Sequence, residues 1–340
     1  MPKILPEQFI ESHNIAFFFH DAMLSTIHDL EKNGILSTKL EFNDKETSEE
    51  FSKIPKKDTF RFLEERDKKD ELYELITKLS YHSLLSDMLH FIYESLKCSE
   101  KGKLTVAYAI LRKPFKESLF YLEMLATNHI DFYERLKSED PNELNLSNSK
   151  IFDDTTKKKI ISNAIAKCPY EPIFDSEFIY DVRYNKHCEY GIELLWQRAN
   201  HLITTFGPIA TEPFNFNFIF LNGKDINSLW FHYYRTVPFL LFYTFNVIEA
   251  IIGKFTVFDP QKADTLPLKA FAGFAIWAEN SDWDEIVEPI GSIGKNVTKD
   301  IPFLCAKCNK SFDFDIKIYK QIFYDDFVKC PNCRFKIRLL

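Results

Sequence analysis

Two pairs of cysteines near residue 340 have the spacing of a metal site. Cys305 and Cys308 form the first pair, Cys330 and Cys333 the second, and two residues separate the thiols in each pair. Such C-x-x-C turns can direct two sulfur atoms each toward one ion while backbone amides donate to the sulfurs. Four thiolates in a tetrahedron are the ligands that structural zinc prefers, and a closed set leaves no position open for catalysis. We therefore predict one structural Zn²⁺ per chain.

The segment that carries these cysteines resembles a zinc ribbon. The 21 residues between Cys308 and Cys330 are enough for a hairpin. Residues 312–318 and 335–339 alternate apolar with polar side chains, as strands do. We expect residues 301–340 to form this small β domain, which needs the metal because its core is too small to fold unaided.

The ribbon segment is basic although the whole chain has a net charge of −7. Residues 301–340 contain eight Lys or Arg and four Asp. Cations neutralise phosphates and aromatic rings stack on bases, so this composition suits contact with RNA or DNA. The same side chains would also serve to contact a protein partner, to cover the hairpin or to dock it on the remaining chain. The candidate contacts are Lys307, Lys310, Arg334, Lys336 and Arg338, and the candidate stacking rings are Tyr319, Phe323 and Tyr324.

Composition limits what the rest of the chain can be. The 340 residues are 45% hydrophobic and include 34 phenylalanines but 9 glycines, which requires an aromatic core and argues against glycine-rich nucleotide loops. The net charge excludes a basic field over the whole molecule. The first residues lack the pattern of a signal peptide, and the apolar stretch 237–252 contains Asn246 and Glu249 and is short for a membrane span. We expect a cytoplasmic protein with reduced thiols and no membrane segment.

The elements that must position a site are mostly helical, since apolar residues recur every three or four positions over long stretches. Asn33-Gly34 marks the end of the first helix, and Pro114 predicts a kink or break. Polar loops are expected over 38–58 and 138–158, and a short strand or extended loop over 214–220. The expected helices cover 7–32, 59–97, 103–122, 156–167, 174–182, 187–203 and 226–254.

The expected fold is mainly α, a multi-helix bundle followed by a small β zinc ribbon. We place a helical domain over 1–280, a linker over 281–300 and the ribbon over 301–340. Within the helical part, residues 101–122 join a small-residue turn to an apolar helix with Arg112 and Glu117, and polar residues precede His201 in residues 194–204. These two segments resemble the HEPN-like and abortive-infection-like domains, over roughly residues 70–255.

The resemblance implies a metal-independent ribonuclease activity. Active HEPN enzymes pair an arginine with a histidine after four to six intervening residues, usually across a dimer. The histidine moves protons and the arginine stabilises charge on the phosphate. Here two residues separate Arg198 from His201, and three separate Arg183 from His187, so both pairs depart from the family spacing although each can share a helix face. The implied catalytic candidates are His201, Arg198 and Arg183, in a homodimer.

Structural roles are open for the same residues. His201 fits equally a hydrogen-bonded histidine at a helix end, and Arg112 with Glu117 fits an internal ion pair. Three functions therefore compete. The first, which we rank highest, is a binding or effector protein of a prokaryotic antiviral defence system whose ribbon contacts nucleic acid or a protein. The second is a HEPN-type ribonuclease, and the third is a dimeric structural adaptor.

Overall fold

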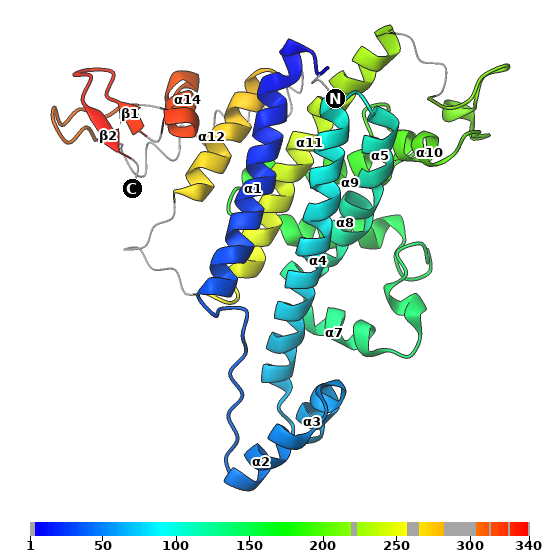
Figure 1. Ribbon diagram of the computed structural model, residues 1–340, viewed down its shortest axis with the longest axis vertical. Coiled ribbons are helices and arrows are strands. Elements are labelled where there is room, and N and C mark those ends of the chain that lie inside the picture. Colours follow the sequence, from blue (N-terminus) through cyan, green and yellow to red (C-terminus); the bar gives the residue numbers. More distant parts are fainter. Residues whose placement is uncertain are drawn as a thin grey trace.

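The computed structural model describes residues 4–218, 223–256, 265–281, 304–312, 314–325 and 327–338. Helices account for most of these residues, and the one sheet among them is a two-stranded pair near the C-terminus (Figure 1). The predicted class, mainly α with a small β ribbon, is confirmed. The predicted linker over 281–300 lies outside the described residues apart from Ser281, as do residues 219 and 220 of the strand or loop predicted over 214–220.

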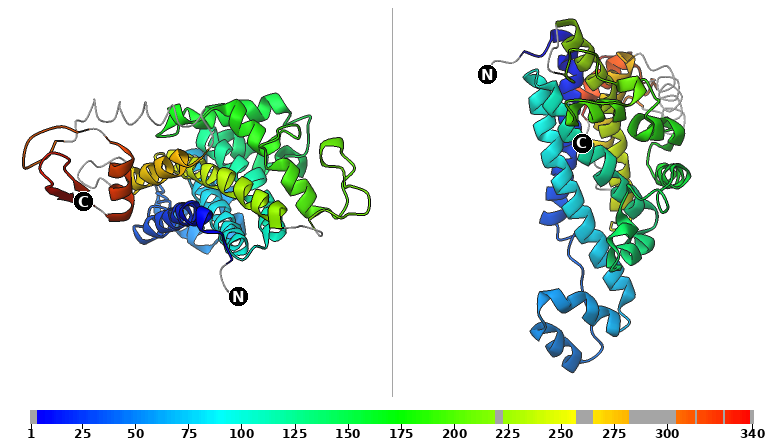
Figure 2. Two further views of the ribbon diagram at one scale, coloured as in Figure 1. Left: turned by 90° about the horizontal axis from the view of Figure 1, so that it is seen from above. Right: turned by 90° about the vertical axis from the view of Figure 1, so that its right-hand side faces the viewer.

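Helices α1 and α4 lie side by side along the long axis of the molecule (Figures 1 and 2). The helices of the first half are α1 (Ile10–Lys32), α2 (Lys45–Lys53), α3 (Thr59–Glu65), α4 (Lys69–Glu100), α5 (Leu104–Arg112), α6 (Leu119–Thr127) and α7 (His129–Lys137). The second half adds α8 (Asp154–Ile165), α9 (Ser176–Tyr184), α10 (Glu193–Asn200), α11 (Gly223–Ile252), α12 (Leu266–Glu279) and α14 (Ile316–Asp325).

Two predicted boundaries hold, but the loop predicted over 38–58 is wrong, and the helix predicted over 59–97 is divided into α3 and α4. Helix α1 ends where Gly34 adopts a φ of +69°, a conformation that glycine reaches without steric cost. Pro114 interrupts the rod of α5 and α6 with a π-helical turn over Lys113–Ser118, because proline has no amide hydrogen to donate. The predicted loop over 38–58 instead contains α2, whose N-cap Asp44 accepts the amide hydrogen of Thr47 at 2.6 Å.

Helix α11 lies at the centre of the core and packs on α1, α6 and α12. It is the one described helix long and apolar enough to cross a membrane, but 78% of its most apolar window is buried inside the protein. Its Phe242 stacks on Phe274 of α12 with ring centroids 4.1 Å apart. Helix α11 is thus placed as a core helix, and the described core extends without interruption from α1 to the four cysteines.

Candidate metal centre and polar pocket

The four predicted metal ligands come together in the structure. The four sulfur atoms lie within 4.8 Å of one another, with 3.5 Å from Cys305 to Cys333 and 3.7 Å from Cys308 to Cys330. A tetrahedral ion with metal–sulfur bonds of about 2.3 Å separates its sulfur ligands by about 3.8 Å. The cluster therefore has the donor set and the spacing to hold one metal ion.

The two cysteine turns share one backbone geometry. The amide of Asn309 donates to the carbonyl of Cys305 at 2.8 Å, and the amide of Arg334 donates to Cys330 at 2.9 Å. Asn309 and Arg334 both have φ in the left-handed region, at 55° and 61°. An antiparallel bridge between residues 304 and 311 closes the first turn, while the second joins strands β1 (Phe327–Lys329) and β2 (Lys336–Arg338).

Hydrogen bonds also affect the ionisation of the cluster. Burial opposes ionisation of Cys305, yet the amides of Cys308 and Lys307 and the neighbouring thiols lower its pKa. At Cys333 the amide of Phe335 lowers the pKa, but burial and the same thiol contacts raise it overall. Metal ligation requires thiolate, so the amides at the Cys305 turn favour binding.

The segment between the two cysteine turns corrects the sequence analysis. The predicted strand over 312–318 is wrong, because helix α14 begins at Ile316 and Asp315 caps it by accepting the amide hydrogen of Ile318 at 2.9 Å. Alternation of phenylalanine with aspartate imitated a strand, whereas the next residues follow helical spacing. The residues that α14 buries are Ile318, Tyr319, Ile322 and Phe323.

Helix α14 docks the metal-binding region (residues 304–338) on α12 and α1 (Figures 1 and 2). The ring of Phe323 lies 4.8 Å from that of Phe18 and fills the space above Gly273. The prediction that Tyr319 and Phe323 are free to stack on bases is therefore wrong, since both are buried. Tyr324 is 50% exposed and donates to Glu11 at 3.1 Å.

The predicted basic contacts of the metal-binding region are all exposed: Lys307, Lys310, Arg334, Lys336 and Arg338. In the hairpin of β1 and β2, Lys329 pairs with Lys336, and Phe327 pairs with Arg338. Neighbouring residues of a strand point to opposite faces, and Val328 is fully buried toward α14. The hairpin therefore has an outer face made of three cations and one aromatic ring.

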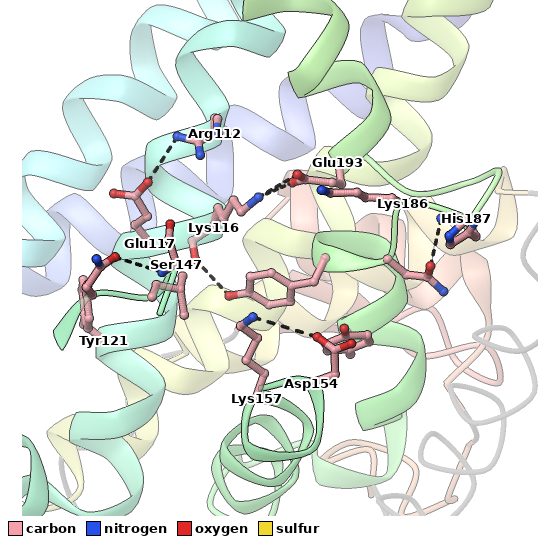
Figure 3. Close-up of a pocket in the computed structure, with 15 residues that line it drawn as sticks. Arg112, Lys116, Glu117, Tyr121, Ser147, Asp154, Lys157, Lys186, His187 and Glu193 are labelled. Carbon is pink, nitrogen blue, oxygen red and sulfur yellow. Dashed lines mark hydrogen bonds and ion pairs between the residues drawn. The ribbon is translucent and has the colours of Figure 1, made fainter. Parts of the chain in front are cut away.

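A second group of charged side chains lines a cavity of 520 Å³ in the helical body (Figure 3). The cavity, called here the polar pocket, opens beside the π-helical turn, between the ends of α5 and α9 and the beginnings of α8 and α10. Its charged or titratable lining residues are Arg112, Lys116, Glu117, Tyr121, Asp154, Lys157, Tyr180, Tyr184, Lys186, His187 and Glu193.

Ion pairs neutralise part of the charge in the polar pocket (Figure 3). Lys116 donates to both oxygens of Glu193 at 2.7 Å, and the Glu193 side chain is fully buried. Arg112 pairs with Glu117 at 3.3 Å, but the two side chains are 40% and 42% exposed, so the pair exists without being internal. Burial lowers the pKa of Lys116 although Glu193 raises it, so this ammonium group is held at an electrostatic cost.

The structure separates the three predicted catalytic residues. Arg183 is fully buried and donates to Glu123 at 2.5 Å and to the carbonyl of Phe115 at 2.7 Å. Arg198 lines a cavity of 340 Å³ and lies over the ring of Phe218, while His201 is exposed beside another cavity of 300 Å³. A catalytic role for these residues stays a prediction.

The polar pocket contains residues that the sequence analysis did not select as site candidates. His187 is the one histidine on its lining, and Lys116, Lys157, Lys186 and Glu193 come from separate segments. Pro114 inside an apolar helix was the one available signal, because π-helical turns in helices often accompany functional sites.

The described residues thus contain two convergent sites, the four-cysteine cluster and the polar pocket. The first is assembled by two local turns and the second by packing of distant helices. Comparisons with protein-family models, with curated proteins and with solved structures found no match to this chain.

Proposed function

We propose that this protein binds nucleic acid through the outer face of a zinc-stabilised C-terminal hairpin. The observation that supports the proposal is the register of β1 and β2, which sets Lys329 directly opposite Lys336. Like charges opposite one another on a strand pair are destabilising, and no ion pair to an acidic side chain offsets them among the described residues. A phosphate chain along this face would relieve the repulsion.

The aromatic ring on the same face adds a second kind of contact. The Lys336 and Lys329 ammonium groups lie 4.5 and 5.6 Å from the centroid of the Phe327 ring. Cations above an aromatic ring resemble the lining of grooves that hold single-stranded nucleic acid, in which cations follow the backbone and rings stack on bases. Single-stranded RNA or DNA is therefore the partner that fits best.

Zinc is the proposed metal of the four-cysteine cluster. A closed set of four thiolates suits zinc or iron, and zinc needs no redox partner for a structural role. When bound, the ion would fix the two cysteine turns at a constant distance. The Cys330 turn, which connects β1 to β2, would then hold the Lys329–Lys336 pair in register.

The proposal is tested by fluorescence anisotropy with single-stranded RNA and DNA over a series of salt concentrations. Replacement of Lys329, Lys336 and Arg338 by alanine should weaken binding and lower the salt slope by about 2, since each lost phosphate contact on a single strand contributes about 0.7. The control replaces three exposed lysines at the other end of the molecule, Lys53, Lys56 and Lys57, with the same change of charge. Equal binding by both variants would refute the proposal.

The other functions considered from the sequence gain less support. A ribonuclease site needs His201 beside an arginine, whereas in the described chain Arg183 is enclosed by its ion pair with Glu123 and Arg198 borders a different cavity. Homodimerisation, contact with a protein partner and a role in antiviral defence stay predictions.

A further inference from the structure

We propose that the polar pocket binds the phosphate group of a nucleotide or of another phosphate monoester. The inference goes beyond the proposed function, because the pocket lies among α5, α8, α9 and α10, on the other side of the helical body from the hairpin (Figures 1 and 2). Three features of the pocket favour a phosphate: the charges that converge there, the buried hydrogen bonds beneath them and the size of the cavity.

Four cationic side chains enter the cavity from three different parts of the chain. Arg112 and Lys116 come from the end of α5 and the π-helical turn, Lys157 from α8 and Lys186 from the segment after α9 (Figure 3). Three carboxylates also line it, which leaves one excess positive charge with His187 neutral. Such an arrangement of cations from separate elements favours an anionic ligand.

The carboxylates are not equally able to neutralise these cations. Glu193 is occupied, since it accepts from Lys116 and also from Gln197 at 2.9 Å. Asp154 is 76% exposed and its oxygen is 4.0 Å from the nitrogen of Lys157, which is only 15% exposed. The Lys157 side chain is therefore largely removed from water, and the one carboxylate within ion-pair distance of it among the described residues is distant and solvated.

Two further observations support a shortage of negative charge. Burial lowers the pKa of Lys157, and the nearby Asp154, Asp153 and Glu193 together only partly offset that effect. Among the described residues, Lys186 forms no ion pair at all, and its charge contributes to the lowered pKa of Lys116. A bound phosphate would neutralise Lys157 and Lys186 together without displacing the pair of Lys116 with Glu193.

The floor of the pocket is rigid. The buried Arg183 donates to the hydroxyl of Tyr184 at 2.9 Å, and that hydroxyl donates to the carbonyl of Lys116 at 2.9 Å. The π-helical turn and α9 are thereby joined directly under the cavity. Preorganised donors bind more tightly because less order is lost when the ligand enters.

The size of the cavity fits a small organic phosphate. Its 520 Å³ lies within the range of roughly 300–1,000 Å³ that is usual for small-molecule sites. Tyr121, Tyr180 and Tyr184 also line the cavity and place aromatic side chains beside a base or sugar bound there. A mononucleotide is therefore the probe that matches the cavity in charge, shape and volume.

The test is isothermal titration calorimetry of the full chain at low ionic strength with inorganic phosphate, AMP, adenosine and a short oligonucleotide with or without a 5′-phosphate. Phosphate and AMP should bind and adenosine should not. Lys157→Met and Lys186→Met should each weaken AMP binding about tenfold or more, because each removes a charged hydrogen bond while keeping the apolar stem. Lys159→Met, an exposed lysine on α8 away from the pocket, should leave binding unchanged.

The results distinguish a free nucleotide from the end of a nucleic-acid strand, and they distinguish binding in the polar pocket from binding on the hairpin. Tighter binding of the oligonucleotide with the 5′-phosphate than of the one without it, in the absence of AMP binding, would assign the site to the end of a nucleic-acid strand. Failure of every phosphate probe to bind at millimolar concentration, or equal weakening by Lys159→Met, would overturn the inference. The hairpin variant with Lys329, Lys336 and Arg338 replaced should retain AMP binding. Thermal unfolding of each variant would show that it is folded. Because Lys186 is exposed, the Lys186→Met variant tests the inference if Lys157→Met does not fold.

Discussion

The helical body (residues 4–281 as described) and the metal-binding region differ in what stabilises them. The body buries large aromatic side chains on several helices at once, as in the stacked rings of Phe242 and Phe274. The metal-binding region has two short turns and a three-residue strand pair, with four sulfurs at its centre. Helix α14 belongs to both, since it lies between the cysteine turns in sequence and packs on α12 in space.

The difference shows which parts of the molecule apolar burial stabilises and which parts need another source of free energy. Apolar burial fixes α14 on the body through Phe323 and Tyr319, but the turns beyond it bury too little surface to hold their shape. A metal ion would supply that missing free energy. The comparison therefore predicts that loss of metal and loss of core contacts damage separate parts of the molecule.

The largest effect is expected from metal removal. Zinc contributes about 10 kcal/mol or more of apparent binding free energy in small structural sites. Elemental analysis should find one zinc per chain, and a strong chelator should abolish hydrogen-exchange protection in β1, β2 and the cysteine turns. Helix α11 should keep its protection, because its contacts lie in the aromatic core. Equal loss of protection in α11 would break the distinction between the two regions.

The second prediction concerns the buried ion pair of the body. Arg183→Met leaves the carboxylate of Glu123 in the core without its cation and should lower the free energy of unfolding by about 3–5 kcal/mol. Urea denaturation measures the loss, and zinc content should not change. The control is Arg61→Met, which removes an arginine 73% exposed and paired with Asp58 and Glu65, where the cost should stay below about 1 kcal/mol.

The smallest predicted effect lies at the junction of the two regions. A methyl group at position 273 would come within 2.6 Å of the Phe323 ring, so Gly273→Ala should weaken the docking of α14 by about 1–3 kcal/mol. Hydrogen exchange in α14 should report the change. Phe323→Leu should relieve the clash, so the double variant should be less destabilised than the two single effects added together. Strict additivity would show that Gly273 and Phe323 do not depend on one another.

Helices with one buried face were predictable from their period, and α11, which is buried on all sides over residues 236–248, from the length of its apolar stretch. The first helix alternates apolar with polar residues at helical spacing and occurs where expected. Helix α12 escaped prediction because residues 270–278 are all buried, so no polar face gives its sequence a period. In α14, phenylalanine and aspartate just before the helix imitated a strand, and the capping role of Asp315 decided the outcome.

The sequence by itself determined which four cysteines come together as candidate metal ligands, because a C-x-x-C turn is local and two residues are enough to aim both sulfurs at one point. Only the tertiary structure decided which charges share the polar pocket and which are buried. Lys116, Lys157 and Glu193 are far apart in the chain and meet through the packing of α8, α10 and the π-helical turn. The same packing encloses Arg183 against Glu123, a placement set by long-range contacts rather than by spacing.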